Sequence, residues 1–153
     1  MKPLNTTIEQ VLIDAIQSEV STRVYYQKLA ARAATADVRR RLLDLSDMEL
    51  VHRAKLERRY MEEFHKLPPD PKVVEIEIPA DIVALDMNRS LKIALDHERE
   101  SESNFRFLAE RVPDTKLGNL FMELAEIEWK HKVDLQNEYD LTAADPEQFL
   151  LDI

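Results

Sequence analysis

Glu-Leu-Val-His at residues 49–52 and Glu-Trp-Lys-His at residues 128–131 are the stretches on which the fold prediction depends. Both have the form Glu-x-x-His. On a helix, residues i and i+3 share one face, so each stretch can present a carboxylate and an imidazole to the same metal ion. A further Glu-x-x-His at residues 62–65 lacks a glutamate thirty residues before it, because position 32 is Arg32. We therefore expect His65 to be a surface histidine.

The two stretches share a third member, a glutamate upstream. Glu19 lies thirty residues before Glu49, and Glu98 lies thirty residues before Glu128. The midpoints fall in Ala-Thr-Ala-Asp at residues 34–37 and Val-Pro-Asp-Thr at residues 112–115, which both look like tight turns. Residues equally far from the turn of a helical hairpin stand at the same height. The sequence therefore predicts two hairpins, each of which brings together two glutamates and one histidine.

Composition limits the class of protein. With 153 residues, a single glycine and long 3.6-residue periodicity, the chain suits one all-helical domain. The absence of cysteine excludes disulfides, thiolate metal sites and cysteine nucleophiles, and it fits a reducing cytoplasm. No apolar run is long enough to cross a membrane, and the net charge of -9 argues against general nucleic-acid binding. We expect a cytoplasmic protein that has neither a membrane nor nucleic acid as its partner.

Capping and periodicity set the expected helix bounds. Thr6 and Glu9 form a capping-box pattern that opens the first helix. The second helix should begin at Thr35 or Asp37, and the third at about Asp81 or Asp86. The expected ends are His65 for the second helix, Arg111 for the third and Asp140 for the fourth, which starts at about Thr115.

The expected core repeats with a period of seventy-nine residues. The matching inward positions are Leu12 and Leu91, Ala15 and Ala94, Tyr26 and Phe105, Leu29 and Leu108, Leu45 and Leu124, Leu56 and Leu135, and Tyr60 and Tyr139. Glu19 and Glu98 lie on these apolar stripes, where a carboxylate is costly unless a cation or hydrogen-bond donors meet it. The chain is therefore predicted to be a duplicated hairpin with a polar site inside its core.

The expected organisation is hairpin 1 over about 7–65, a crossover over about 66–81, hairpin 2 over about 82–140 and a tail over 141–153. Prolines exclude a helix from the crossover, whose extended length of roughly 50 Å could return the chain along a whole helix. Pairing of its alternating segment at 73–78 as a strand with another subunit is an alternative. The tail has a cap and first-turn proline at Asp145 and Pro146, which predict a short docking helix. A partner-binding peptide is the alternative there.

Six side chains form the candidate metal site: Glu19, Glu49, His52, Glu98, Glu128 and His131. Carboxylates can bridge two ions while each imidazole terminates one, so the set describes a dinuclear centre that suits iron or manganese, and zinc could also occupy it. The pattern resembles the ferritin-like di-iron carboxylate proteins, closest to the rubrerythrin or erythrin branch. This resemblance implies a ferritin-like four-helix bundle that binds two iron ions and reacts with hydrogen peroxide or dioxygen.

The resemblance also implies individual roles. Glu49 and Glu128 would be bridging carboxylates, Glu19 and Glu98 terminal ones, and the two histidines the nitrogen ligands. Tyr26 matches a tyrosine that the family often has near its metals, where a hydrogen bond to the site and ordinary core packing are both open. The family typically carries a further glutamate at the position of Ser101, for which Glu102 is the nearest substitute.

Other expectations concern partners and function. The chain lacks the four cysteines of a rubredoxin-like module, so electrons must come from an external donor or from iron itself. The branch commonly forms dimers, which implies a homodimer. The first hypothesis is a peroxidase- or ferroxidase-type di-iron oxidoreductase that acts in oxidative stress or iron handling. Iron storage or metal buffering, and a non-catalytic binding or structural bundle, are the alternatives.

Overall fold

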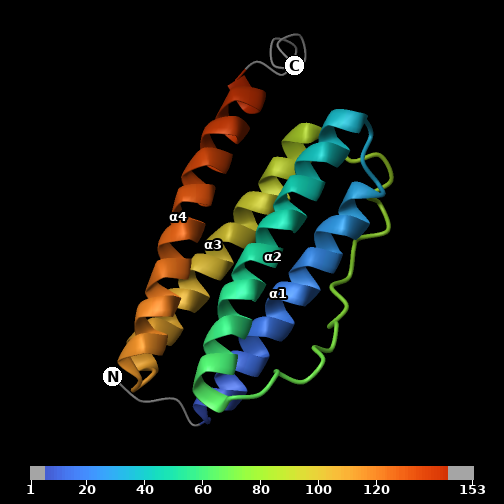
Figure 1. Ribbon diagram of the computed structural model, residues 1–153. Helices are drawn as coiled ribbons and strands as arrows, with labels where there is room; N and C mark the ends of the chain where they lie inside the picture. The colour runs from blue at the N-terminus through green and yellow to red at the C-terminus, as the bar shows by residue number, and fades with distance from the viewer. Residues whose placement is uncertain (1–5, 145–153) are drawn as a thin grey trace. The chain divides into compact units, whose positions relative to one another are not determined.

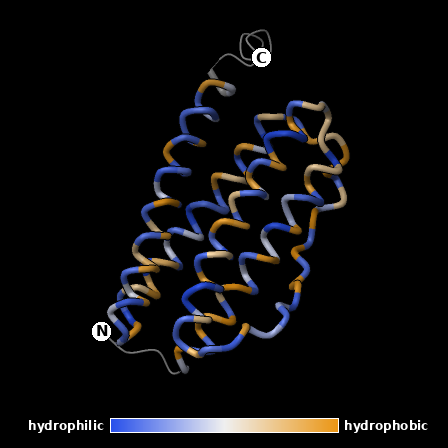
Figure 2. The backbone as a smooth tube through the Cα atoms, viewed as in Figure 1, coloured by the Kyte–Doolittle hydropathy of each residue, from blue (hydrophilic) through white to orange (hydrophobic). Residues whose placement is uncertain are grey.

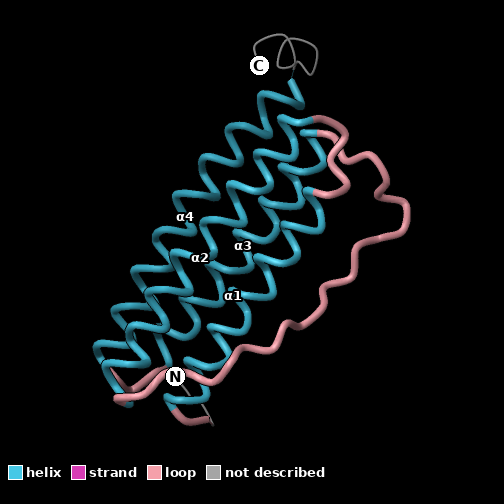
Figure 3. Tube along the Cα trace, turned by 45° about the vertical axis from the view of Figure 1, so that its right-hand side comes forward, coloured by secondary structure: helices cyan, strands magenta, loops and turns pink. Residues whose placement is uncertain are grey.

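The structure, a computed structural model, describes residues 6–144. It contains four helices in the order α1 (Ile8–Ala30), α2 (Ala36–Phe64), α3 (Met87–Arg111) and α4 (Thr115–Ala144). The helices pair as two hairpins, α1 with α2 and α3 with α4, and the described residues divide into two compact units, 6–85 and 86–144. No described residue belongs to a β-strand, as Figure 3 shows. The all-α class and the two hairpins are therefore confirmed.

The first hairpin turns at residues 31–35, as the spacing predicted. Thr35 caps α2, because its hydroxyl accepts a hydrogen bond from the Val38 amide. The start of α1 differs by one residue from the prediction. Thr7 is its N-cap and accepts from the Gln10 amide, whereas Thr6 precedes the cap. Glu9 instead binds the Tyr60 hydroxyl and Lys66 through its carboxylate.

His65 ends α2 and is exposed, which agrees with its prediction as a surface residue. It lies in the left-handed region at a φ of 53° and donates its amide to the Met61 carbonyl. This conformation is a common way to end a helix and is unusual for a residue with a β-carbon. The Glu-x-x-His at residues 62–65 is therefore part of a helix terminus.

The crossover returns along α1, as Figure 1 shows by the extended trace that leaves the end of α2. The Val74 amide donates to the Ser21 hydroxyl at 2.8 Å, and Lys28 binds Glu75 at 2.9 Å. At the far end of the crossover, the Leu85 amide donates to the Arg32 carbonyl and the Ala34 amide donates to the Leu85 carbonyl, both at 2.8 Å. The crossover is therefore fastened to its own hairpin along the second half of α1 and the turn after it, and it extends to residue 85, before the Asp86 cap.

The second hairpin begins at Asp86, the later of the two predicted starts. The Asp86 carboxylate accepts from the Arg89 amide, and α3 ends at Arg111 as expected. Asp114 accepts from the Leu117 amide at 2.8 Å at the start of α4. The fourth helix continues past Asp140 through Ala144, so the predicted tail begins too early. The rest of that segment, with its expected short helix, lies outside the described residues.

Burial follows the predicted repeat for most pairs. Five of the predicted pairs are buried at both positions: Leu12 and Leu91, Ala15 and Ala94, Tyr26 and Phe105, Leu45 and Leu124, and Leu56 and Leu135. Leu108 and Tyr139 are only half-buried, unlike Leu29 and Tyr60. Hydrophobic and hydrophilic residues alternate along each helix in Figure 2, as expected for helices with one apolar stripe. Within the described residues, no helix has the length and apolar character needed to cross a membrane.

Candidate metal centre

The first hairpin gathers three metal-ligating side chains in its interior. One ligand atom from each of Glu19, Glu49 and His52 lies within 4.8 Å of the others, and all three residues are buried. His52 Nδ1 is 3.6 Å from Oε2 of Glu19 and 3.9 Å from Oε2 of Glu49. Two donors that each lie about 2.1 Å from one ion are at most about 4.2 Å apart. Both pairs satisfy that limit, so these three residues, hereafter the first triad, can share a cation.

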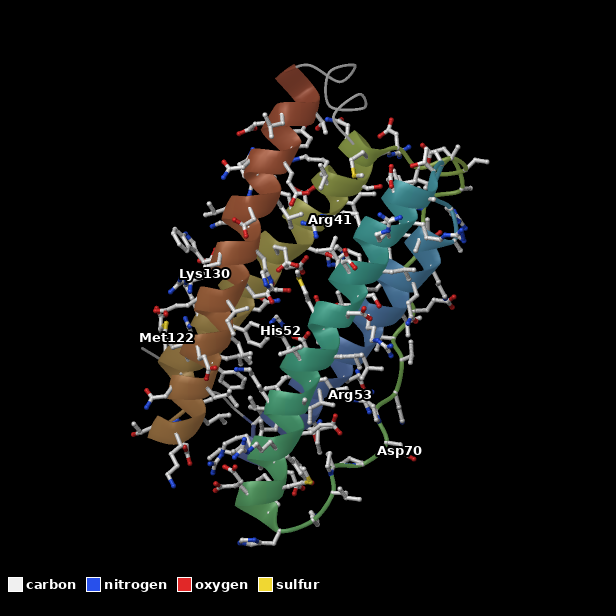
Figure 4. The ribbon with its side chains drawn as sticks, turned by 45° about the horizontal axis from the view of Figure 1, so that its top comes forward. Arg41, His52, Arg53, Asp70, Met122 and Lys130 are labelled. Carbon is white, nitrogen blue, oxygen red and sulfur yellow. The ribbon has the colours of Figure 1, made fainter. Side chains whose placement is uncertain are left out.

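Local sequence explains this arrangement. Glu19 lies on the stripe of α1 that also carries Ala15 and Tyr26, and Glu49 and His52 occupy two positions of the stripe on α2. Because the turn is centred near residue 34, the hairpin register brings α1 and α2 residues thirty positions apart to the same height. In Figure 4, His52 is labelled beside its neighbour Arg53, and the two side chains leave α2 in different directions.

The second hairpin repeats the pattern less tightly. His131 Nδ1 is 3.8 Å from Oε2 of Glu98, and Glu98 and Glu128 are 2% and 1% exposed. Glu128 lies one turn before His131 on α4. We call Glu98, Glu128 and His131 the second triad. Among residues 86–144, no three candidate ligand atoms come as close together as those of the first triad. The His131 side chain is also 21% exposed, against 2% for His52.

Two buried carboxylate oxygens fit a cation at this position. Oε2 of Glu19 and Oε2 of Glu98 are inaccessible to solvent and accept no hydrogen bond from the described residues. A buried acceptor that makes no hydrogen bond costs about 1–3 kcal/mol, and more when it is charged. A cation would offset that cost at both positions. The oxygen-rich donor set with imidazole nitrogen fits iron or manganese better than a softer ion.

Tyr26 is fully buried on α1, seven residues after Glu19. Its ring packs against that of Tyr25 at a centroid distance of 6.1 Å. Burial also raises the pKa of the Tyr25 hydroxyl. The aromatic pair therefore belongs to the apolar interior of the first hairpin, and a role for Tyr26 at the metals remains a proposal.

Glu102 has partners that the sequence reasoning missed. Its Oε1 accepts from Lys132 Nζ at 2.6 Å and its Oε2 accepts from Arg106 Nε at 2.9 Å. Burial alone raises the pKa of Glu102, but the hydrogen bonds and charges of Lys132 and Arg106 outweigh burial and lower it. Both oxygens are thus engaged by cations, so in this arrangement Glu102 does not replace the glutamate missing at Ser101. The signal was present in the sequence, because Lys132 follows Glu102 by thirty residues, as Glu128 follows Glu98.

Comparisons with known proteins support the fold and the family. A structure of a hypothetical protein from Pyrococcus furiosus is similar, with a TM-score of 0.63 and 23% identity over 94% of this chain and 98% of that chain. A dodecameric thioferritin, the bacterioferritin-related protein from Bacteroides fragilis, has a TM-score of 0.69 and 20% identity over 93% of this chain and 92% of that one. Comparison with curated protein sequences gave no significant match.

The structural neighbours show that the fold is ferritin-like. The family model described as Rubrerythrin matches residues 10–139, which include all six candidate ligands. That range covers most of the sequence and both hairpins. The chain therefore belongs to the rubrerythrin family.

Proposed function

We propose that the first and second triads meet at one dinuclear centre and that the protein is a non-haem di-iron oxidoreductase. The observation that carries this proposal is the buried first triad, in which a Glu19 oxygen makes no hydrogen bond while His52 lies 3.6 Å away. The repeat of the same residue types in the second hairpin supports it. So does the ligand scheme of ferritin-like carboxylate proteins, which takes one Glu from each of two helices and one Glu-x-x-His from each of the other two.

The six residues take the roles expected from the family. Glu49 and Glu128 would be the bridging carboxylates, Glu19 and Glu98 would be the terminal ones, and His52 and His131 would be the nitrogen ligands. Iron is the proposed metal, although manganese or zinc can use the same donors. Two bound ferrous ions would together supply the two electrons that reduce hydrogen peroxide or dioxygen.

The protein's own contribution is a dry and preorganised site. Leu45 and Leu56 lie one to two turns from the first triad on α2 and are buried, so they exclude water from that part of the hairpin. Removing water strengthens the attraction between carboxylates and a cation, because the local dielectric constant falls. Tyr26 is proposed to act from the same interior by a hydrogen bond to the site.

Further proposals follow from this function. The two units form one ferritin-like domain, and the protein acts as a homodimer in the cytoplasm. Because the sequence has no cysteine for a rubredoxin-like iron site, a separate electron donor is proposed to return the centre to its ferrous state.

Iron storage is the second candidate function, and the structural similarity to a thioferritin favours it. In storage, oxidation of iron leads to ferric deposition rather than to repeated turnover. A binding or structural bundle without bound iron is a third candidate, and metal analysis of protein from iron-replete cells tests it directly.

The discriminating experiment is rapid mixing of diferrous protein with peroxide and, separately, with dioxygen while ferric absorbance is followed. We expect fast oxidation of two irons per chain and repeated cycles when a reductant is added. Ferric accumulation well beyond two irons per chain, without cycling, would instead support storage. A protein that takes up no iron would contradict both.

A further inference from the structure

The residue after each candidate ligand histidine is a cation, and the two cations form different ion pairs. Arg53 follows His52 and binds Glu57 at 2.8 Å on its own helix. Lys132 follows His131 and binds Glu102 at 2.6 Å, from α4 across to α3. An ion pair beside the ligand histidine therefore joins the two helices only in the second hairpin.

Glu102 lies where it can hold α3 and α4 together beside the second triad. It lies four residues after Glu98, on the same side of α3, and is only 9% exposed. Its second oxygen binds Arg106, whose guanidinium contacts the sulfur of Met122 on α4 at 3.5 Å. Glu102 thus ties α3 to α4 directly through Lys132, the residue after His131, and indirectly through Arg106 and Met122.

The first hairpin cannot make the same connection. The position seventy-nine residues before Glu102 is Arg23, so a cation stands where the second hairpin has a carboxylate. The first triad is instead held by burial, as the 2% exposure of the His52 side chain shows. The second triad is looser and its histidine is 21% exposed. The two halves are alike in ligands and unlike in what holds those ligands in place.

We propose that Glu102 is a positioning residue for the second triad and that the two metal ions consequently bind with unequal strength. This inference rests on the proposed dinuclear centre. The Glu102 ion pairs hold α4 against α3 so that His131 and Glu128 face Glu98. The ion held by Glu98 and His131 then depends most on these ion pairs, which salt weakens because the pairs are partly exposed. The ion held by Glu19 and His52 depends on them only through the shared Glu128.

The test is a Co²⁺ titration of apo-protein followed by visible absorbance, at low and high salt. Glu102→Gln is compared with the natural protein and with Glu57→Gln, a matched control that removes the ion pair of the first hairpin. We expect Glu102→Gln to weaken the second equivalent of Co²⁺ about tenfold or more, as loss of a residue that orients ligands typically does, and to weaken the first equivalent much less, because only the shared Glu128 connects it to this residue. Glu57→Gln should change neither equivalent. Lys132→Arg, which keeps a cation facing Glu102, should retain most of the affinity.

Amide hydrogen exchange of the apo-proteins gives a second readout that needs no metal. Exchange around His131 should be faster in Glu102→Gln than in the natural protein, whereas exchange around His52 should be unchanged. Equal Co²⁺ affinities and equal exchange in Glu102→Gln and the natural protein would overturn the positioning role alone. Failure of the natural protein to bind two Co²⁺ ions would overturn the proposed centre, and this inference with it.

Discussion

Oε2 of Glu19 lies 3.6 Å from Nδ1 of His52, inside the first hairpin and on a different helix. Neither side chain has appreciable contact with solvent, and the Glu19 oxygen accepts no hydrogen bond from the described residues. Natural cores rarely keep such a group unless a ligand or ion compensates for it. We therefore expect the Glu19 carboxylate to lower the stability of the metal-free protein and to favour the binding of a metal ion.

Replacing Glu98 with Gln should stabilise the metal-free protein, because it removes the charge from a buried side chain of which one oxygen accepts no hydrogen bond. We expect the free energy of unfolding to rise by about 1–3 kcal/mol. The melting temperature should rise by roughly 2–4 °C for each kcal/mol in a chain of this size. Added Fe²⁺ or Mn²⁺ should then stabilise the variant less than it stabilises the natural protein. Glu100→Gln is the matched control, since Glu100 is exposed on the same helix, and its melting temperature should stay unchanged.

Thr7→Ala should destabilise the protein by about 0.5–2 kcal/mol, because it removes the hydroxyl that accepts the Gln10 amide at the start of α1. Thr6→Ala should change stability by only a few tenths of a kcal/mol, since Thr6 precedes the cap. Urea unfolding of both variants measures the difference. A larger loss for Thr6→Ala than for Thr7→Ala would assign the cap to Thr6.

The Glu102 ion pairs should make stability depend on pH. Lys132 and Arg106 hold the pKa of Glu102 below its ordinary value of 4.5, despite the opposing effect of burial. A carboxyl whose pKa is lowered by folding adds stability above its unfolded-state pKa and loses it as the pH falls through its folded-state pKa. The difference in unfolding free energy between the natural protein and Glu102→Gln should therefore be constant near neutral pH and shrink below about pH 4.5. A difference that grows as the solution is acidified would contradict this assignment.

Arg32→Ala should loosen the crossover, because Arg32 donates to the Pro79 and Ile82 carbonyl groups at 3.3 and 3.0 Å. We expect a loss of about 1–2 kcal/mol for the two hydrogen bonds and faster proteolysis within residues 66–81. Lys28→Ala removes the more exposed ion pair to Glu75 and should have almost no effect. Limited proteolysis with a mapped first cleavage site separates the two variants.

The repeat and the periodicity were sufficient to predict both hairpins and their registers. Glu19 and Glu49 are a fixed number of residues from a recognisable turn, and helix geometry converts that number into a height. The closeness of Glu19, Glu49 and His52 follows from this relation. The shared placement of the two triads stays a prediction, because it depends on packing between hairpins rather than on register within one.

Helix ends were harder to predict. Thr6 and Thr7 can both cap a helix, and the capping-box pattern favoured the wrong one because Glu9 follows Thr6 by three residues. No glycine or proline follows Asp140 before residue 146, so the sequence carried no stop signal where the helix was expected to end. In the structure the Thr142 hydroxyl bonds to the Tyr139 carbonyl and accepts from Asn88, which helps to hold this last turn against α3.

The Glu102 ion pairs were missed for a different reason. As a substitute ligand, Glu102 was expected to face the metals, whereas the residue at the same height on the facing helix carries the opposite charge. Lys132 stands thirty residues after Glu102, the spacing that also relates Glu98 to Glu128. The repeat could not predict that the His131 side chain is more exposed than that of His52, because this difference depends on packing that the repeat does not specify.

The most direct test of the central claim is iron K-edge X-ray absorption on protein loaded with two irons per chain. A shared centre predicts an iron–iron scattering distance of roughly 3.5–4 Å, typical of two-metal sites. It also predicts that Glu49→Ala or Glu128→Ala removes this signal by disrupting both ions together. Two tightly bound irons without an iron–iron signal, each lost separately on mutation of its own triad, would show two independent sites and contradict the account.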